Sequence, residues 1–142
     1  MQVREATDDD ALDVRRVLDA AMLEVREDLS ECIDSGDVLV AEEGESILGA
    51  LVLVPKSGED AAYIDAVAVR RARRAQGVGT ALVGRAAERE GQLTAEFDAD
   101  VRPFYEALGF DVSPVEGADG ERGEQEESGE REERDRFWGV LD

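Results

Sequence analysis

The sequence predicts a single α+β domain over residues 1–142, with a mixed, mostly antiparallel sheet of about six to seven strands flanked by about four helices. The first observation is length, because 142 residues fit one domain with a real core. The second is a hydrophobic content of 42%. The third is the alternation of short apolar runs with segments of helical spacing, in the order β–α–α–β–β–β–α–β–α–β–β.

The N-terminal part predicts a strand followed by two helices. Residues 2–6 have strand character. Thr7 then caps a helix, and Asp10 three residues later completes a capping box. Apolar residues at helical spacing extend this helix to Val25. A second short helix is expected at residues 28–33.

The middle of the chain predicts a hairpin, a strand and a long helix. Residues 37–42 and 46–55 are apolar runs joined by a short turn, which is typical of an antiparallel hairpin. Residues 62–69 form the next strand, and residues 77–90 form a helix. Gly91 is expected to stop that helix.

The C-terminal part predicts strands around one short helix and an acidic loop. Pro103 starts the helix and Gly109 ends it. Residues 116–135 hold ten acids, three Arg, four Gly and no aromatic residue, so we expect a mobile loop there. The remaining strands are expected at residues 93–97, from 110 to 112 and at 136–141.

The charge balance is strongly acidic, with 36 Asp and Glu against 16 Lys and Arg and a net charge of −20. We interpret this as adaptation to a salt-rich cytoplasm, as in halophilic archaea, because salt screens the self-repulsion. An acidic partner-binding surface is the alternative. The charge disfavours nucleic acid. No apolar run reaches membrane-spanning length and no signal peptide opens the chain, so we expect a cytoplasmic protein without membrane contact.

Residue types that are absent or rare limit the chemistry. Histidine is absent, which excludes His-based triads and His metal sites, and we expect no metal. The single cysteine, Cys32, cannot form an internal disulfide. Proton transfer would therefore fall to Asp, Glu, Tyr, Cys, Lys, the backbone or water.

One stretch stands out from the acidic background. Residues 66–87 contain no Asp or Glu and five Arg, and within them a strand leads through a basic loop with Gly77 and Gly79 into a helix. A helix start presents unpaired N–H groups and the positive end of the dipole, and glycines let an anion approach. The stretch predicts a phosphate cradle. The alternative is an ordinary turn in which the glycines serve only the backbone.

Two motifs now resemble one family. The segment Arg74-Ala75-Gln76-Gly77-Val78-Gly79 is similar to the R/Q-x-x-G-x-G/A signature of the GNAT superfamily of N-acetyltransferases. The segment Pro103-Phe104-Tyr105-Glu106-Ala107-Leu108-Gly109-Phe110 resembles the second motif of that family. The element order fits the GNAT fold over nearly the whole chain.

The resemblance implies acetyl-CoA as co-substrate and direct attack of an amine on its thioester. It makes Tyr105 the general acid toward the CoA thiolate, a role that suits an unperturbed tyrosine pKa of ~10. From the residues alone, a packing role beside Phe104 and Phe110 is favoured for Tyr105. The implied coenzyme-binding residues are Val67, Ala68 and Val69 for the pantetheine arm and Arg74, Ala75, Gln76, Gly77, Val78, Gly79 and Thr80 for the diphosphate.

The sequence also departs from the family and leaves roles open. Ala75 replaces a common glycine, Asp98 stands where many relatives have Asn, and Arg70 replaces a frequent His or Asn. Asp65 and Glu96 are candidates for the general base, and water alone is the other candidate.

Function therefore has two main readings. The first is an acetyl-CoA-dependent N-acetyltransferase acting on an amine that the sequence does not identify. The second is a non-catalytic acetyl-CoA-binding or sensing module of the same fold. A nucleotide binder is a weaker third reading, because the glycine loop lacks the lysine of a P-loop. An exposed final strand is compatible with a homodimer.

Overall fold

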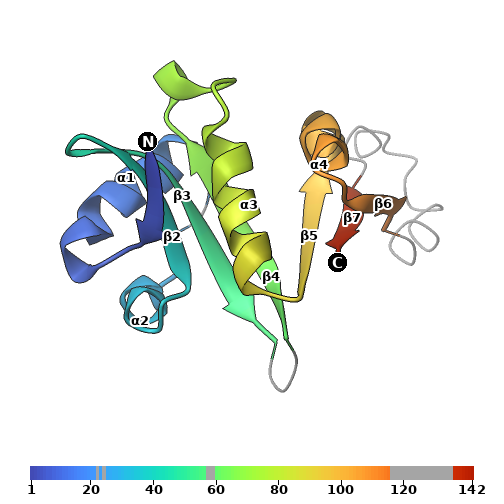
Figure 1. The fold of residues 1–142 in the computed structure, drawn as a ribbon, viewed down its shortest axis with the longest axis horizontal. Helices are drawn as coiled ribbons and strands as arrows, with labels where there is room; N and C mark the ends of the chain where they lie inside the picture. The colour runs from blue at the N-terminus through green and yellow to red at the C-terminus, as the bar shows by residue number, and fades with distance from the viewer. Residues whose placement is uncertain (22, 24, 57–59, 116–135) are drawn as a thin grey trace, which may run out of the picture. The chain divides into compact units, whose positions relative to one another are not determined.

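The computed structural model describes residues 1–21, 23, 25–56, 60–115 and 136–142 (Figure 1). These residues contain seven strands and four α-helices, which confirms the predicted α+β class. They form two compact units, Met1–Leu93 and Thr94–Asp142. The acidic loop predicted at residues 116–135 lies outside the described residues. A single domain over the whole chain stays a prediction.

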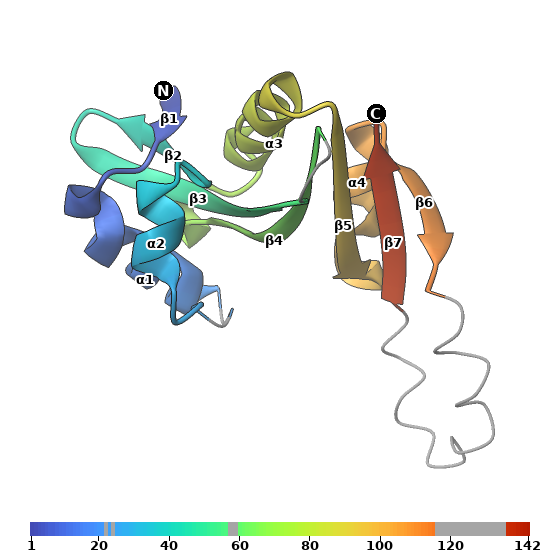
Figure 2. The same ribbon diagram turned by 90° about the horizontal axis from the view of Figure 1, so that it is seen from below.

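The first unit is a four-stranded antiparallel sheet between helices. The strands follow the order β1–β2–β3–β4. Two helices, α1 and α2, lie on one face of this sheet, and α3 lies on the other (Figure 2). The elements are β1 (Gln2–Glu5), α1 (Ala11–Ala20), α2 (Leu29–Asp34), β2 (Val38–Glu43), β3 (Ser46–Pro55), β4 (Ala61–Val69) and α3 (Val78–Arg89).

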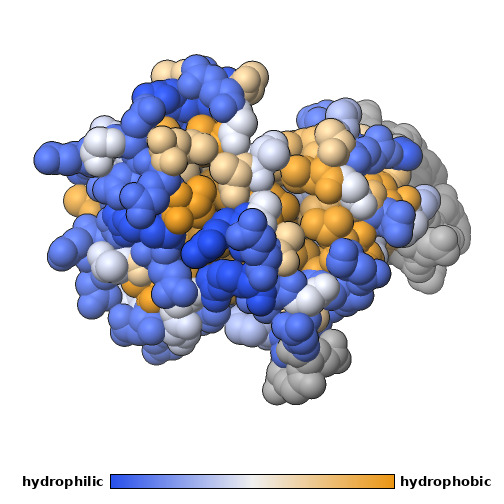
Figure 3. All heavy atoms as spheres, in the orientation of Figure 1, coloured by the Kyte–Doolittle hydropathy of each residue, from blue (hydrophilic) through white to orange (hydrophobic). Residues whose placement is uncertain are grey.

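The core of this unit forms because β2 and β3 are apolar on both faces. Val38 and Val40 are fully buried against α1 and α2. Leu82 on α3 is fully buried as well. Each such Val or Leu side chain contributes roughly 1.5–3 kcal/mol on burial. Polar residues cover much of the visible face of the first unit, as expected for so acidic a chain (Figure 3).

The first helix is shorter than predicted. It is preceded by a 3-10 turn, Asp8–Asp10, in which Asp10 accepts a hydrogen bond from the Thr7 N–H at 2.7 Å. The helix ends at Ala20 rather than Val25. The helix ends there because the Leu23 N–H donates a hydrogen bond to the Leu18 carbonyl at 3.0 Å, and such a bond is typical of a helix C-terminus.

The C-terminal end of α3 also has a different cause from the expected one. The last residue of α3 is Arg89, and Glu90 is already extended, with φ −108° and ψ 150°. Gly91 therefore does not end the helix in a left-handed conformation. It is needed for close approach instead, since an added Cβ would lie 2.8 Å from the backbone oxygen of Asp60.

The second unit joins three strands and one helix. Strand β7 lies between β5 and β6, and β6 pairs with β7 in antiparallel fashion. Helix α4 starts with Pro103 in its first turn, and Gly109 follows it at φ +98°, as the sequence predicted. The elements are β5 (Gln92–Asp98), a 3-10 turn (Ala99–Val101), α4 (Arg102–Ala107), β6 (Asp111–Pro114) and β7 (Arg136–Leu141).

Candidate functional site

The loop between β4 and α3 turns sharply through two left-handed residues. A short 3-10 turn, Arg71–Arg73, follows β4. Ala75 then adopts φ +66° and Gly77 adopts φ +87°. Glycine reaches this region without strain, whereas alanine does not. Ala75 is the only non-glycine residue with positive φ among the described residues.

The start of α3 leaves backbone donors available. The first helical hydrogen bond runs from the Ala81 N–H to the Gly77 carbonyl at 3.0 Å, and no side chain caps the helix. Within the described residues, the N–H groups of Val78, Gly79 and Thr80 have no hydrogen-bond partner. A Cβ added at Gly77 would meet nothing within 4 Å, and the first turn holds no acid. This arrangement fits an anion such as a diphosphate.

Three arginines of the loop bind neighbouring parts of the protein, whereas their charge alone would suggest that they bind an anion. Arg70 donates from Nε to the Ile47 carbonyl at 2.6 Å, and Arg73 forms an ion pair with Glu43. Arg74 donates from Nε to the Val69 carbonyl at 3.3 Å. These side chains tie the loop to the β2–β3 hairpin and to the end of β4. Backbone amides are therefore the best placed donors for an anion.

Strand β4 carries the other predicted binding residues of the first unit. Val67, Ala68 and Val69 pair with Leu51, Ala50 and Gly49 of β3. Ala68 is buried, whereas the side chains of Val67 and Val69 are half-buried.

Asp65 lies at a β-bulge in the same strand. Val52 pairs with Ala66 and Leu53 pairs with Ile64, so Asp65 is the extra residue of β4. A bulge re-aims the side chain that it carries. The Asp65 carboxylate lies 3.6 Å from Nη1 of Arg26, whose Nε is 2.8 Å from Asp28. No local pattern in the sequence pointed to Arg26, since its pair with Asp65 joins segments far apart in the chain.

The second unit places Tyr105 in an aromatic cluster. Its side chain is 5% exposed, and its ring stacks on Phe97 at 4.2 Å between centroids and 10° between planes. Phe104 and Phe110 contact the ring edge-on at 5.0 and 5.1 Å. Packing therefore fixes the plane of the ring. Both readings of Tyr105 require this, since a general acid must also be held in place.

Glu96 and Asp98 share a partner on the neighbouring strand. Arg136 contacts Glu96 at 3.4 Å and Asp98 at 2.6 Å. The hydrogen bond to Asp98 raises the pKa of Arg136. All three side chains are exposed or nearly so. The positive charge of Arg136 balances the negative charge of one of the two carboxylates.

Two other kinds of site are absent from the residues that the structure describes. No cluster of three or more His, Cys, Asp or Glu side chains there could hold a metal ion. None of the helices described is long and apolar enough to cross a membrane.

Comparison with known proteins identifies the family. Residues 34–112, more than half of the chain, match the model of the acetyltransferase (GNAT) domain. The chain belongs to the GNAT family. The match includes parts of both units and both sequence motifs, and it confirms the predicted family. A search of curated proteins found no significant match.

Solved structures share the fold at low sequence identity. A GNAT-family acetyltransferase from Bacillus cereus is 18% identical with a TM-score of 0.75, covering 99% of this chain and 95% of that one. An aminoglycoside 6'-N-acetyltransferase complexed with coenzyme A is 15% identical with a TM-score of 0.69, covering 99% and 96%. N-acetylglutamate synthase from Neisseria gonorrhoeae, complexed with coenzyme A and N-acetyl-glutamate, is 17% identical with a TM-score of 0.71. The match to it covers 99% of this chain, which spans 35% of that protein.

Proposed function

We propose that the protein transfers the acetyl group of acetyl-CoA to a primary amine. The observation that carries this proposal is the start of α3, where the N–H groups of Val78, Gly79 and Thr80 have no partner in the described residues and Gly77 leaves open space. Family membership and the coenzyme A complexes of proteins with the same fold support it.

The coenzyme-binding residues have two roles in this proposal. The amides of residues 74–80 hold the diphosphate, aided by the positive end of the α3 dipole. The main chain of Val67, Ala68 and Val69 positions the pantetheine arm. Ala75 and Gly77 set the loop geometry through their left-handed backbone. Arg70 and Arg73 hold the loop against the hairpin.

Acetyl transfer needs one base and one acid. The amine nitrogen attacks the thioester carbonyl, the C–N bond forms and the C–S bond breaks. Tyr105 gives its proton to the departing thiolate. Asp65, Glu96 or water takes the proton that the amine loses. Asp65 and Glu96 each have an arginine beside them, Arg26 and Arg136.

A thiol-release assay tests the proposal. The protein is incubated with acetyl-CoA and a panel of primary amines at molar KCl, and free CoA is measured. We expect release with at least one amine. CoA binding without release across the panel would instead favour the non-catalytic module, for which the buried, packed ring of Tyr105 is the supporting observation.

Replacing Tyr105 with Phe tests the acid role. The change keeps the ring and its stacking on Phe97 but removes the hydroxyl. We expect kcat to fall roughly 100-fold, as for loss of a general acid, while KM for acetyl-CoA stays near the wild-type value. Tyr63→Phe, at the only other tyrosine, is the matched control. An unchanged kcat in Tyr105→Phe would remove the hydroxyl from the mechanism.

A further inference from the structure

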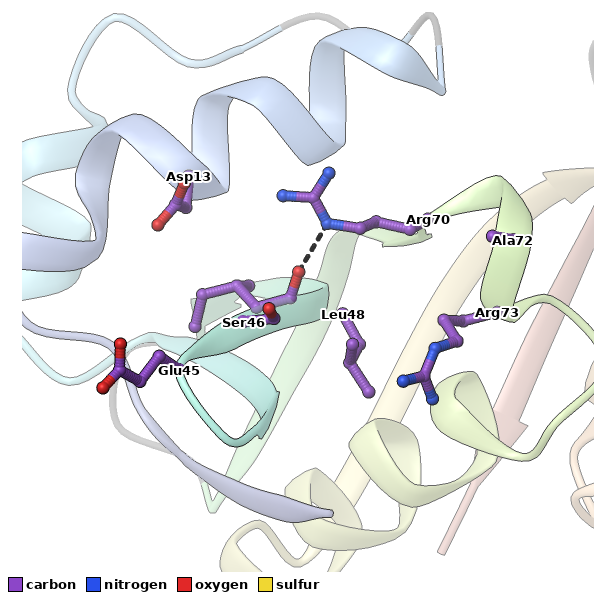
Figure 4. A pocket seen from close by; sticks show the side chains of 8 residues that line it. Asp13, Glu45, Ser46, Leu48, Arg70, Ala72 and Arg73 are labelled. Atoms are coloured by element: carbon purple, nitrogen blue, oxygen red, sulfur yellow. Dashed lines mark hydrogen bonds between the residues drawn. The ribbon is translucent and has the colours of Figure 1, made fainter.

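A cavity lies within the first unit. It is open to solvent and has a volume of about 420 Å³ between α1, the β2–β3 hairpin and the loop after β4 (Figure 4). Ile47 and Leu48 also line it, and each of these two residues is only 3% exposed. None of residues 74–80 lines it, so it is separate from the proposed coenzyme site. Its volume is within the range of small-molecule pockets, ~300–1,000 Å³.

Arg70 supplies a fixed cation to this cavity. Its backbone N–H donates to the Leu48 carbonyl at 2.8 Å, and its Nε donates to the Ile47 carbonyl at 2.6 Å. Both bonds hold the residue against β3. Figure 4 shows the two terminal nitrogens of the guanidinium pointing toward α1. In the described part of the chain, neither nitrogen has a hydrogen-bond partner or an ion pair.

Two carboxylates line the same cavity. Asp13 reaches it from α1, and Glu45 reaches it from the hairpin turn (Figure 4). Among the described residues, neither forms an ion pair, and neither contacts Arg70. The remaining cation, Arg73, is already paired with Glu43. The cavity therefore holds one available guanidinium and two available carboxylates, at separate positions on its wall.

We propose that this cavity binds an amino acid with a cationic side chain. The terminal nitrogens of Arg70 bind its carboxylate, because a guanidinium presents a fork that matches carboxylate geometry. Asp13 and Glu45 bind its two positive groups. A diamine lacks the group that Arg70 binds, and an acidic amino acid is repelled by the two carboxylates.

Calorimetric titration of lysine tests this site. No acetyl-CoA is present, so the result does not depend on the proposed acetyl transfer. The KCl concentration is the lowest at which circular dichroism shows the folded protein, since salt weakens exposed ion pairs. We expect saturable binding of lysine. Pentane-1,5-diamine and glutamate should each bind at least about tenfold more weakly.

Variants locate the binding. Asp13→Asn and Arg70→Gln should each weaken lysine binding at least about tenfold. Asp19→Asn on the same helix and Arg71→Gln in the same loop do not line the cavity and should bind like wild type. Should Arg70→Gln fail to fold, Asp13→Asn decides alone. The proposal is overturned if wild type shows no saturable binding, or if Asp13→Asn binds lysine as tightly as wild type.

Discussion

Replacing Ala75 with glycine should stabilise the protein, although it removes a methyl group. Ala75 is exposed and adopts φ +66°. An L-residue pays about 1–2 kcal/mol for this left-handed conformation, and glycine does not. Glycine costs about 0.4–1 kcal/mol through the greater freedom of the unfolded chain. The net gain is about 0.5–1 kcal/mol, or a rise in Tm of roughly 1–4 °C for a domain of this size.

Urea unfolding of the ligand-free protein measures this change. Gly84→Ala provides the matched comparison, because Gly84 is exposed within α3 and an added Cβ meets nothing within 4 Å. It should stabilise the helix by about 0.8–1 kcal/mol. Ala75→Gly and Gly84→Ala are opposite substitutions, yet both should raise the free energy of unfolding, because each one suits the backbone conformation at its position. If Ala75 were not left-handed, glycine would only add freedom to the unfolded chain, and the variant would be about 0.5 kcal/mol or more less stable than wild type. That result would refute the left-handed conformation of Ala75.

Three further predictions concern packing, pH and salt. Gly49→Ala should cost about 1–3 kcal/mol in urea unfolding, because its Cβ would lie 2.9 Å from the Ala68 carbonyl oxygen and 3.0 Å from Val78 Cγ1; an unchanged midpoint would contradict this packing. Hydrogen bonds from Arg4 lower the pKa of Asp10, so its contribution is present above the unfolded pKa of ~3.9 and is lost as pH falls through the folded pKa. Asp10→Asn should therefore cost about 1–3 kcal/mol at pH 7 and progressively less below pH ~4, and a pH-independent difference would argue against the Arg4 contact. Raising KCl from about 0.1 to 2 M should raise Tm, because screening reduces the repulsion of a −20 chain, and a falling Tm would exclude the halophilic interpretation.

Local signals in the sequence were sufficient for most elements. Apolar patterning placed β3 and β4 within one residue of their observed bounds, because each strand is a long run between turn residues. Pro103 and Gly109 marked both ends of α4, since each residue acts through its own backbone. Ala75 stands where glycine is common in the family, and its φ of +66° is the left-handed conformation that glycine adopts more easily.

Features that depend on distant contacts were not predictable. The end of α1 near Ala20 depends on a returning hydrogen bond that apolar periodicity does not encode. The bulge at Asp65 depends on the register of β3 against β4. The anchoring of Arg70 to the Ile47 carbonyl joins residues 23 positions apart. The cluster of arginines in the sequence therefore predicted a basic loop, but it did not predict which group each arginine side chain binds.

In the proposed function, backbone amides at the start of α3 hold the diphosphate of coenzyme A. Amide ¹H–¹⁵N spectra recorded during a titration with coenzyme A test this contact, with pantetheine, which lacks the diphosphate, as the control. We expect large shifts at Val78, Gly79 and Thr80 with coenzyme A and small ones with pantetheine. Saturable binding of coenzyme A that leaves these three amides unmoved would contradict this contact.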